Sequence, residues 1–118
     1  MINSQKKGKN FEREIAKDLE KKFGVRVMRT PCSGGIHDFH TADLMIKDTR
    51  SLLYDLHIEC KKRESLSVMK VYDDTKLKAG GKIPIVIWSK NLRPSPLVII
   101  GYEDFFKYVE DVETLSKT

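Results

Sequence analysis

The stretch that decides the fold runs Leu52-Leu53-Tyr54-Asp55-Leu56-His57-Ile58-Glu59-Cys60-Lys61. Successive side chains of a β-strand point to opposite faces. One face of a strand over residues 52–61 is therefore expected to be apolar and to face the core: Leu52, Tyr54, Leu56, Ile58 and Cys60. The other face carries an acid and a base two residues apart, Glu59 and Lys61.

Apolar periodicity and turn residues place the other elements around this strand. Helices are expected over residues 10–23, 67–79 and 103–115, with Asn10 as the N-cap of the first. Strands are expected over residues 25–30, 42–47, 83–88 and 97–100, and the last two read as buried apolar runs. This order predicts an α/β fold with a central mixed sheet of about five strands flanked by helices.

Length and composition bound the class of protein. The 118 residues are expected to form a single domain, 1–118, with residues 1–9 as a flexible basic arm and 116–118 as a frayed tail. The net charge of +5 favours a polyanionic partner such as nucleic acid. We expect a cytoplasmic protein with no membrane partner, because no apolar run has the length of a membrane helix, no signal peptide is visible and two cysteines make no disulfide scaffold.

One carboxylate of the first helix falls on its apolar side. At about 100° per residue, Phe11, Ile15, Leu19 and Phe23 form an apolar arc with Glu12 in its middle. A buried carboxylate is costly unless a cation or a metal ion balances its charge. Glu12 therefore either meets such a partner or is a helix N-terminal acid stabilised by the macrodipole.

Two further acids lie on neighbouring strands. Asp43 opens the strand that precedes Glu59 and Lys61, and the acids converge near one strand end if the two strands pair. Converging oxygen ligands suit Mg²⁺ or Mn²⁺, and a lysine beside them can stabilise charge on a scissile phosphate. The alternative is a solvated sheet face with a cross-strand ion pair.

Basic residues flank these carboxylates along the chain. Seven of them could follow a phosphate backbone: Lys6, Lys7, Lys9, Arg13, Arg29, Lys62 and Arg63. The segment Ser33-Gly34-Gly35 either offers backbone N–H groups to a phosphate or is a simple turn. His37 and His40 either assist proton transfer or lie in a polar loop that meets DNA or solvent.

Four motifs together resemble the archaeal-type Holliday junction resolvases of the PD-(D/E)xK nuclease superfamily. In family order they are Gly8-Lys9-Asn10-Phe11-Glu12-Arg13-Glu14, Arg29-Thr30-Pro31-Cys32-Ser33-Gly34-Gly35, Ala42-Asp43-Leu44 and Ile58-Glu59-Cys60-Lys61. The short chain would fit a phage or viral relative of these enzymes, which would act in the host cytoplasm.

The resemblance implies a restriction-endonuclease-like core and a Mg²⁺-dependent endodeoxyribonuclease, with Mn²⁺ as a substitute and no small-molecule cofactor. It assigns catalytic roles to Glu12, Asp43, Glu59 and Lys61. The three acids would face the metal, Glu12 directly or through water, and the backbone carbonyl of Cys60 would be a further ligand. Contact with DNA or support of catalysis would fall to Arg13, Arg29 and Ser33.

The resemblance also implies a substrate. Four-way junctions would be resolved by paired symmetric nicks that leave 5′-phosphate and 3′-hydroxyl ends. One chain offers one site, so a homodimer with twofold symmetry would follow, and the apolar segments 83–88, 97–100 and 105–112 would divide between core and dimer surface. Two alternatives stay open: a nuclease of the same superfamily that acts on flaps, ends or other branched DNA, and a non-catalytic basic DNA-binding module.

Overall fold

The helices and strands follow the predicted order. The computed structural model describes residues 4–31, 42–92 and 94–117. Its elements are α1 (Ser4–Phe23), β1 (Val27–Arg29), β2 (Leu44–Ile46), the 3₁₀ helix η1 (Leu52–Asp55), β3 (Leu56–Lys62), α2 (Val68–Lys78), β4 (Ile83–Ser89), β5 (Leu97–Ile100) and α3 (Tyr102–Ser116). The α/β class is confirmed, and among the described residues no helix combines the length and apolarity of a membrane span.

The five strands form two sheets, whereas the sequence predicts one. β1 and β2 pair in antiparallel fashion, β3 pairs in parallel with β4, and β5 runs antiparallel to β4. The sheets are joined through the backbone of Asp43, whose carbonyl accepts a hydrogen bond from Thr30 N–H at 2.9 Å and whose N–H donates to the Ile58 carbonyl at 3.0 Å. Asp43 therefore has a fixed position at the junction of the two sheets.

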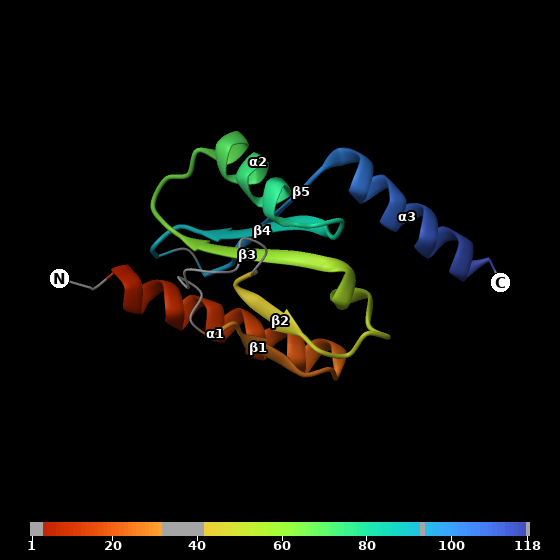
Figure 1. The fold of residues 1–118 in the computed structure, drawn as a ribbon, viewed down its shortest axis with the longest axis horizontal. Coiled ribbons are helices and arrows are strands. Elements are labelled where there is room, and N and C mark those ends of the chain that lie inside the picture. Colours follow the sequence, from red (N-terminus) through yellow and green to blue (C-terminus); the bar gives the residue numbers. More distant parts are fainter. Residues whose placement is uncertain (1–3, 32–41, 93, 118) are drawn as a thin grey trace.

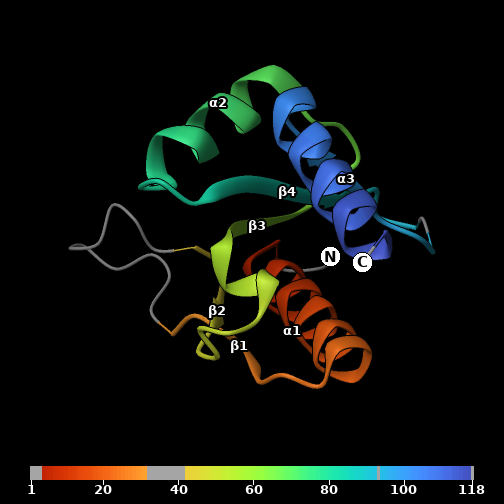
Figure 2. The same cartoon turned by 90° about the vertical axis from the view of Figure 1, so that its right-hand side faces the viewer.

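Helices cover both sides of the central strands. α1 and the β1–β2 pair lie on one side of β3 and β4, and α2 lies on the other (Figures 1 and 2). Phe11 and Ile15 of α1 pack into a core with Ile58 of β3, which is 1% exposed. Because both faces of β3 are covered, its central residues are fixed on either side.

Two boundaries differ from the predicted ones for local reasons. α1 begins at Ser4, so Asn10 is not its N-cap, and residues 4–9, expected to be a flexible arm, are its first turns. Residues 52–55 form η1 instead of the start of a strand, because Ser51 Oγ accepts a hydrogen bond from Leu53 N–H at 3.1 Å. Leu52 is consequently 65% exposed instead of lying in the core.

The C-terminal elements add little to the core. Within the described part of α3 no residue is buried, and the helix projects away from the sheets (Figure 1). The expectation of a buried strand is correct for β4 but wrong for β5, where Leu97 is 45% and Val98 61% exposed. The structure thus assigns segment 83–88 to the core and leaves Leu97 and Val98 of β5 and most apolar residues of α3 exposed, while Ile100 of β5 packs against the core.

Candidate active site

The predicted acids come from separate elements and meet at β3. Glu12 belongs to α1, Asp43 directly precedes β2, and Glu59 lies in β3. Asp43 Oδ2 accepts a hydrogen bond from Cys60 N–H at 2.8 Å, which holds the aspartate beside the middle of β3. The expected convergence of Asp43 and Glu59 is therefore present, and it arises from hydrogen bonds of Asp43 to the backbone of β3 instead of a regular strand ladder.

Asp43, which is partly buried, and Glu59, which is buried, form a carboxyl pair in which each group acts on the pKa of the other. Burial, together with the charge of Glu59 and the hydrogen bond to it, raises the pKa of Asp43 from its ordinary 3.8 to about 7. Burial also acts to raise the pKa of Glu59, but hydrogen bonds with His57 and Asp43 and the charge of Lys78 bring it below its ordinary value. Below about pH 7 the two carboxyl groups therefore hold one proton between them, and they release it as the pH rises above that value.

The chemistry of this pair fits a divalent cation. The pKa of Asp43 is raised although the charge of Lys78 acts on Glu59, so the negative charge of the pair is not fully balanced. Carboxylate oxygens are the ligands that Mg²⁺ and Mn²⁺ prefer. Glu12 lies near enough for its charge to raise the pKa of Asp43 further. Across residues 4–31, 42–92 and 94–117, no three His, Cys, Asp or Glu side chains are grouped closely enough to hold a metal. Glu12 therefore does not form a three-residue cluster with the pair in this structure.

Glu12 faces the interior, as its position on the apolar arc predicts. Its side chain is 12% exposed, and Arg29 Nε donates a hydrogen bond to its Oε1 at 2.9 Å. Burial raises the pKa of Glu12 overall, while the charge of Arg29 acts against that rise. The helix dipole is not the explanation, because α1 begins at Ser4 and dipole effects fade beyond the first turn. Arg29 is the cation that the buried carboxylate required.

We expect Arg29→Met to lower the free energy of unfolding by about 2 kcal/mol, because it leaves a buried carboxylate without its cation. The double variant Arg29→Met, Glu12→Gln should recover most of this loss, since it also removes the charge. Urea unfolding of the three proteins at pH 8 measures both effects. A single variant as stable as the wild type would show that the ion pair does not hold Glu12 in place.

Lys61 lies on the same face of β3 as Glu59, and both line a cavity of about 410 Å³ between β3 and α2. The positive charge of Lys61 acts on Glu12, where it opposes the rise in pKa. Lys78 of α2 lines the same cavity, and its charge acts on Glu59. Lys78 has no role predicted from the sequence, because helical spacing alone does not show which side of α2 turns toward β3.

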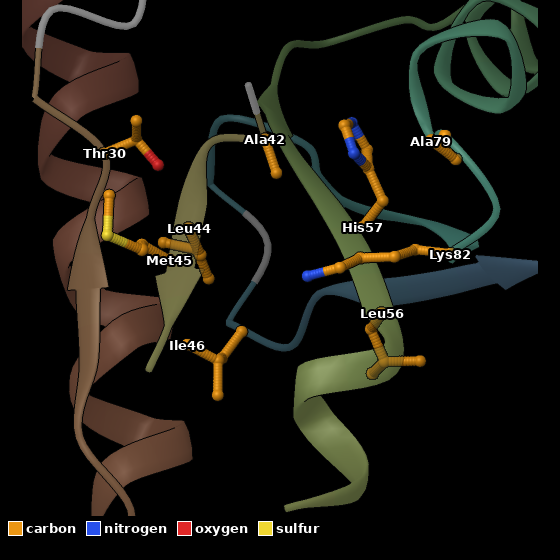
Figure 3. Close-up of a pocket in the computed structure, with 10 residues that line it drawn as sticks. Thr30, Ala42, Leu44, Met45, Ile46, Leu56, His57, Ala79 and Lys82 are labelled. Carbon is orange, nitrogen blue, oxygen red and sulfur yellow. The ribbon is translucent and has the colours of Figure 1, made fainter. Parts of the chain in front are cut away.

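His57 is a second residue whose place the sequence did not show. It is 2% exposed, and its Nε2 lies 3.4 Å from Glu59 Oε1. On its other side it lines a cavity of about 480 Å³ between β2 and β3, together with Lys82 (Figure 3). Because Glu59 is itself only 7% exposed, the alternative of a solvated sheet face is wrong. The only sequence signal was the spacing of two residues from Glu59.

The predicted DNA-binding residues do not form one group. Four of them lie along the first half of α1: Lys6, Lys7, Lys9 and Arg13. Arg29 instead forms an ion pair with Glu12. The end of β3 brings Lys62 beside α1, where it lines a cavity with Lys7 and its Nζ lies 5.4 Å from the centroid of the Phe11 ring. Arg63 instead lines the cavity that contains Lys61. Ser33, His37 and His40 lie outside the described residues.

Comparison with known proteins adds a family and a fold. A family model described as “Phage putative PDDEXK endonuclease” matches residues 3–117. Among solved structures, the chain is similar to Hjc of Archaeoglobus fulgidus, a Holliday junction resolvase from an archaeal hyperthermophile. The TM-score is 0.55 at 23% sequence identity, over 79% of this chain and 76% of that chain, a likeness of fold. No curated protein matches the chain.

Proposed function

The chain belongs to the phage PDDEXK endonuclease family, and from this membership we propose that it is a Mg²⁺-dependent endonuclease that resolves four-way DNA junctions. The observation that carries the proposal is the buried Asp43–Glu59 carboxyl pair, with Lys61 on the same face of β3 as Glu59. A DNA-binding module has no use for buried acids that repel phosphate, so the pair favours catalysis over binding alone. The fold shared with Hjc supports branched DNA as the substrate.

Each residue of the site has a part in the proposed reaction. Asp43 and Glu59 would hold the metal, with the Cys60 carbonyl as a further ligand. Glu12 would contact the metal directly or through a water molecule. The bound Mg²⁺, or Mn²⁺ in its place, supplies Lewis-acid stabilisation of negative charge on the phosphate. Lys61 stabilises charge that develops on the scissile phosphate, and the cut leaves 5′-phosphate and 3′-hydroxyl ends.

Cleavage of a synthetic four-way junction in Mg²⁺ tests this proposal, with linear duplex and flap DNA as parallel substrates and Glu59→Gln as the inactive control. Paired symmetric nicks that the variant does not make are the expected result. Cutting of flaps or duplex in preference to junctions would keep the active site and reject the junction as substrate. Junction binding without any cutting in Mg²⁺ or Mn²⁺ would reject an enzymatic function in favour of a DNA-binding module.

Two symmetric nicks require two sites, so the proposal includes a homodimer. The apolar residues that the monomer leaves uncovered offer a surface for it: Leu97 and Val98 of β5, and Phe106, Val109 and Val112 of α3. A second copy with the same exposed residues would cover them by a self-complementary contact, as twofold symmetry requires.

We expect the wild type to sediment as a dimer at micromolar concentration and Val109→Glu to sediment as a monomer, because the substitution places a charge in the apolar contact. Lys107→Glu introduces an acid on the same helix at a residue that is not apolar, and it should remain dimeric. The monomeric variant should nick one arm of a junction without the paired second cut. A wild type that is monomeric at these concentrations would reject this surface as a dimer interface.

A further inference from the structure

The cavity between β3 and α2 extends well beyond the residues used in the proposed reaction. Its volume is about 410 Å³. The side chains that line it are Glu59, Lys61, Arg63, Ser67, Lys70, Val71, Asp74, Thr75 and Lys78. Four of these are basic and two are acidic, and one of the acids is Glu59 itself. Apart from Glu59, the lining therefore has four basic side chains against one acid, Asp74, and is positively charged overall.

The arrangement of α2 places its lysines along this cavity. Residues four apart on a helix lie in one row, so Lys70, Asp74 and Lys78 share a row that lines the cavity. The neighbouring row packs toward the sheet through Thr75, which is 2% exposed and whose Oγ1 donates to the Val71 carbonyl at 2.8 Å. The small Thr75 side chain with its satisfied hydroxyl lets α2 lie close to β4, and the two lysines then flank the cavity.

The β3 side of the cavity is equally well fixed. Arg63 follows Lys61 by two residues, about 6.6 Å farther along the chain direction. The Arg63 N–H donates to the Ser89 carbonyl at 3.0 Å, and its own carbonyl accepts from the Trp88 indole N–H at 2.9 Å. Hydrogen bonds with Ser89 and Trp88 of β4 thus fix the backbone of Arg63, and its side chain extends from a fixed point.

We propose that Arg63, Lys70 and Lys78 form a binding site for the backbone phosphate that neighbours the scissile phosphate on the same DNA strand. This inference rests on the proposed function. Before a metal binds, the acids of the site repel a phosphate backbone, and Lys61 serves the scissile phosphate. The three further cations that line the cavity would offset this repulsion along the strand that reaches Glu59. The cavity is continuous with Glu59 and Lys61, which favours the next phosphate of the bound strand over a separate anion.

Junction binding in EDTA at several salt concentrations tests the site without cleavage. The double variant Lys70→Gln, Lys78→Gln should weaken binding about 10-fold and lower the slope of log K against log[salt] by about 0.9, the value for one phosphate contact. Lys76→Gln is the matched control, because Lys76 lies on the same helix and is exposed but does not line the cavity. It should leave both quantities unchanged.

Methylphosphonate substitution locates the phosphate. A neutral methylphosphonate in place of the phosphate next to the scissile one should weaken junction binding by the wild type about 10-fold. It should not weaken junction binding by the double variant any further, because both changes remove the same contact. If the wild type cuts junctions but the double variant binds them as tightly as Lys76→Gln does, this phosphate site would be overturned and the proposed function would stand. A wild type that neither binds nor cuts branched DNA would overturn both.

Discussion

Asp43→Asn should abolish cleavage and at the same time stabilise the metal-free protein at pH 8. The amide keeps an oxygen that can accept the hydrogen bond from the Cys60 N–H, whose nitrogen lies 2.8 Å from Asp43 Oδ2 in the wild type. This side-chain bond to the backbone of β3 should therefore survive. It removes the negative charge that a divalent cation requires. We expect the cleavage rate to fall about 10³-fold or more, equivalent to roughly 4 kcal/mol of transition-state stabilisation.

The gain in stability follows from the shared proton. The pKa of Asp43 is about 7 in the folded protein and near 3.8 when unfolded, so the folded state keeps a proton that the unfolded chain releases between these values. This contribution to stability is complete below about pH 3.8 and is lost as the pH rises to 7. About two of these pH units lie above pH 5, so we expect the wild type to lose about 2–3 kcal/mol between pH 5 and 8. The lowered pKa of Glu59 acts only at more acidic pH and does not change this loss. Asp43→Asn should show no such loss.

Urea unfolding at pH 5 and pH 8, with and without Mg²⁺, measures this difference. Mg²⁺ should raise the stability of the wild type at pH 8 and leave Asp43→Asn unchanged, because a ligand stabilises only the folded state that binds it. Asp48→Asn is a suitable control, since Asp48 pairs at the surface with Arg50 and lies apart from the carboxyl pair. Cleavage by Asp43→Asn at the wild-type rate, or wild-type stability that does not vary with pH, would contradict the assignment.

Most of the fold could be predicted because its elements have strong apolar periodicity, but α1 shows where that signal ends. Residues 4–9 carry no apolar stripe and read as an arm, yet they are helical. Extending a helix adds one hydrogen bond for each residue fixed, whereas starting one is costly, so a packed segment such as that around Phe11 and Ile15 can carry an unpacked turn with it. At η1 the apolar alternation predicts more strand than the structure has. The Ser51 hydroxyl accepts a hydrogen bond from Leu53 N–H, so the strand does not extend back to Leu52.

The acids of the site could be predicted from position, whereas their partners could not. Glu12 is predicted because it interrupts an apolar arc. Asp43 is predicted because it opens a strand, and Glu59 because it lies on the polar face of the next strand, two residues before Lys61. Arg29 and Lys78 act on these acids across elements, and their placement depends on how the elements pack. The exposed residues of α3 show the same limit: their apolarity indicates a face that needs a partner, but only the packed structure shows that the monomer does not supply it.

Lys61→Gln should lower the cleavage rate at saturating protein about 10²- to 10³-fold while the junction Kd in EDTA changes less than about threefold. Removal of one donor that stabilises developing charge costs this much in other enzymes, and a single cation contributes little to the affinity of a large polyanionic interface. Lys61 shares a cavity with Glu59, whereas the next residue, Lys62, lies over the Phe11 ring on the other side of β3.

Lys62→Gln is therefore the matched control, because it removes the same charge one residue away. It should change the junction Kd by less than about threefold, as expected for a single cation of a large interface, and should keep the cleavage rate at saturation that Lys61→Gln loses. Single-turnover cleavage at increasing protein concentration separates the two quantities for both variants. If Lys61→Gln raised the Kd and cut at the wild-type rate when saturated, Lys61 would be a phosphate contact, and the chemistry would rest on the carboxyl pair without it.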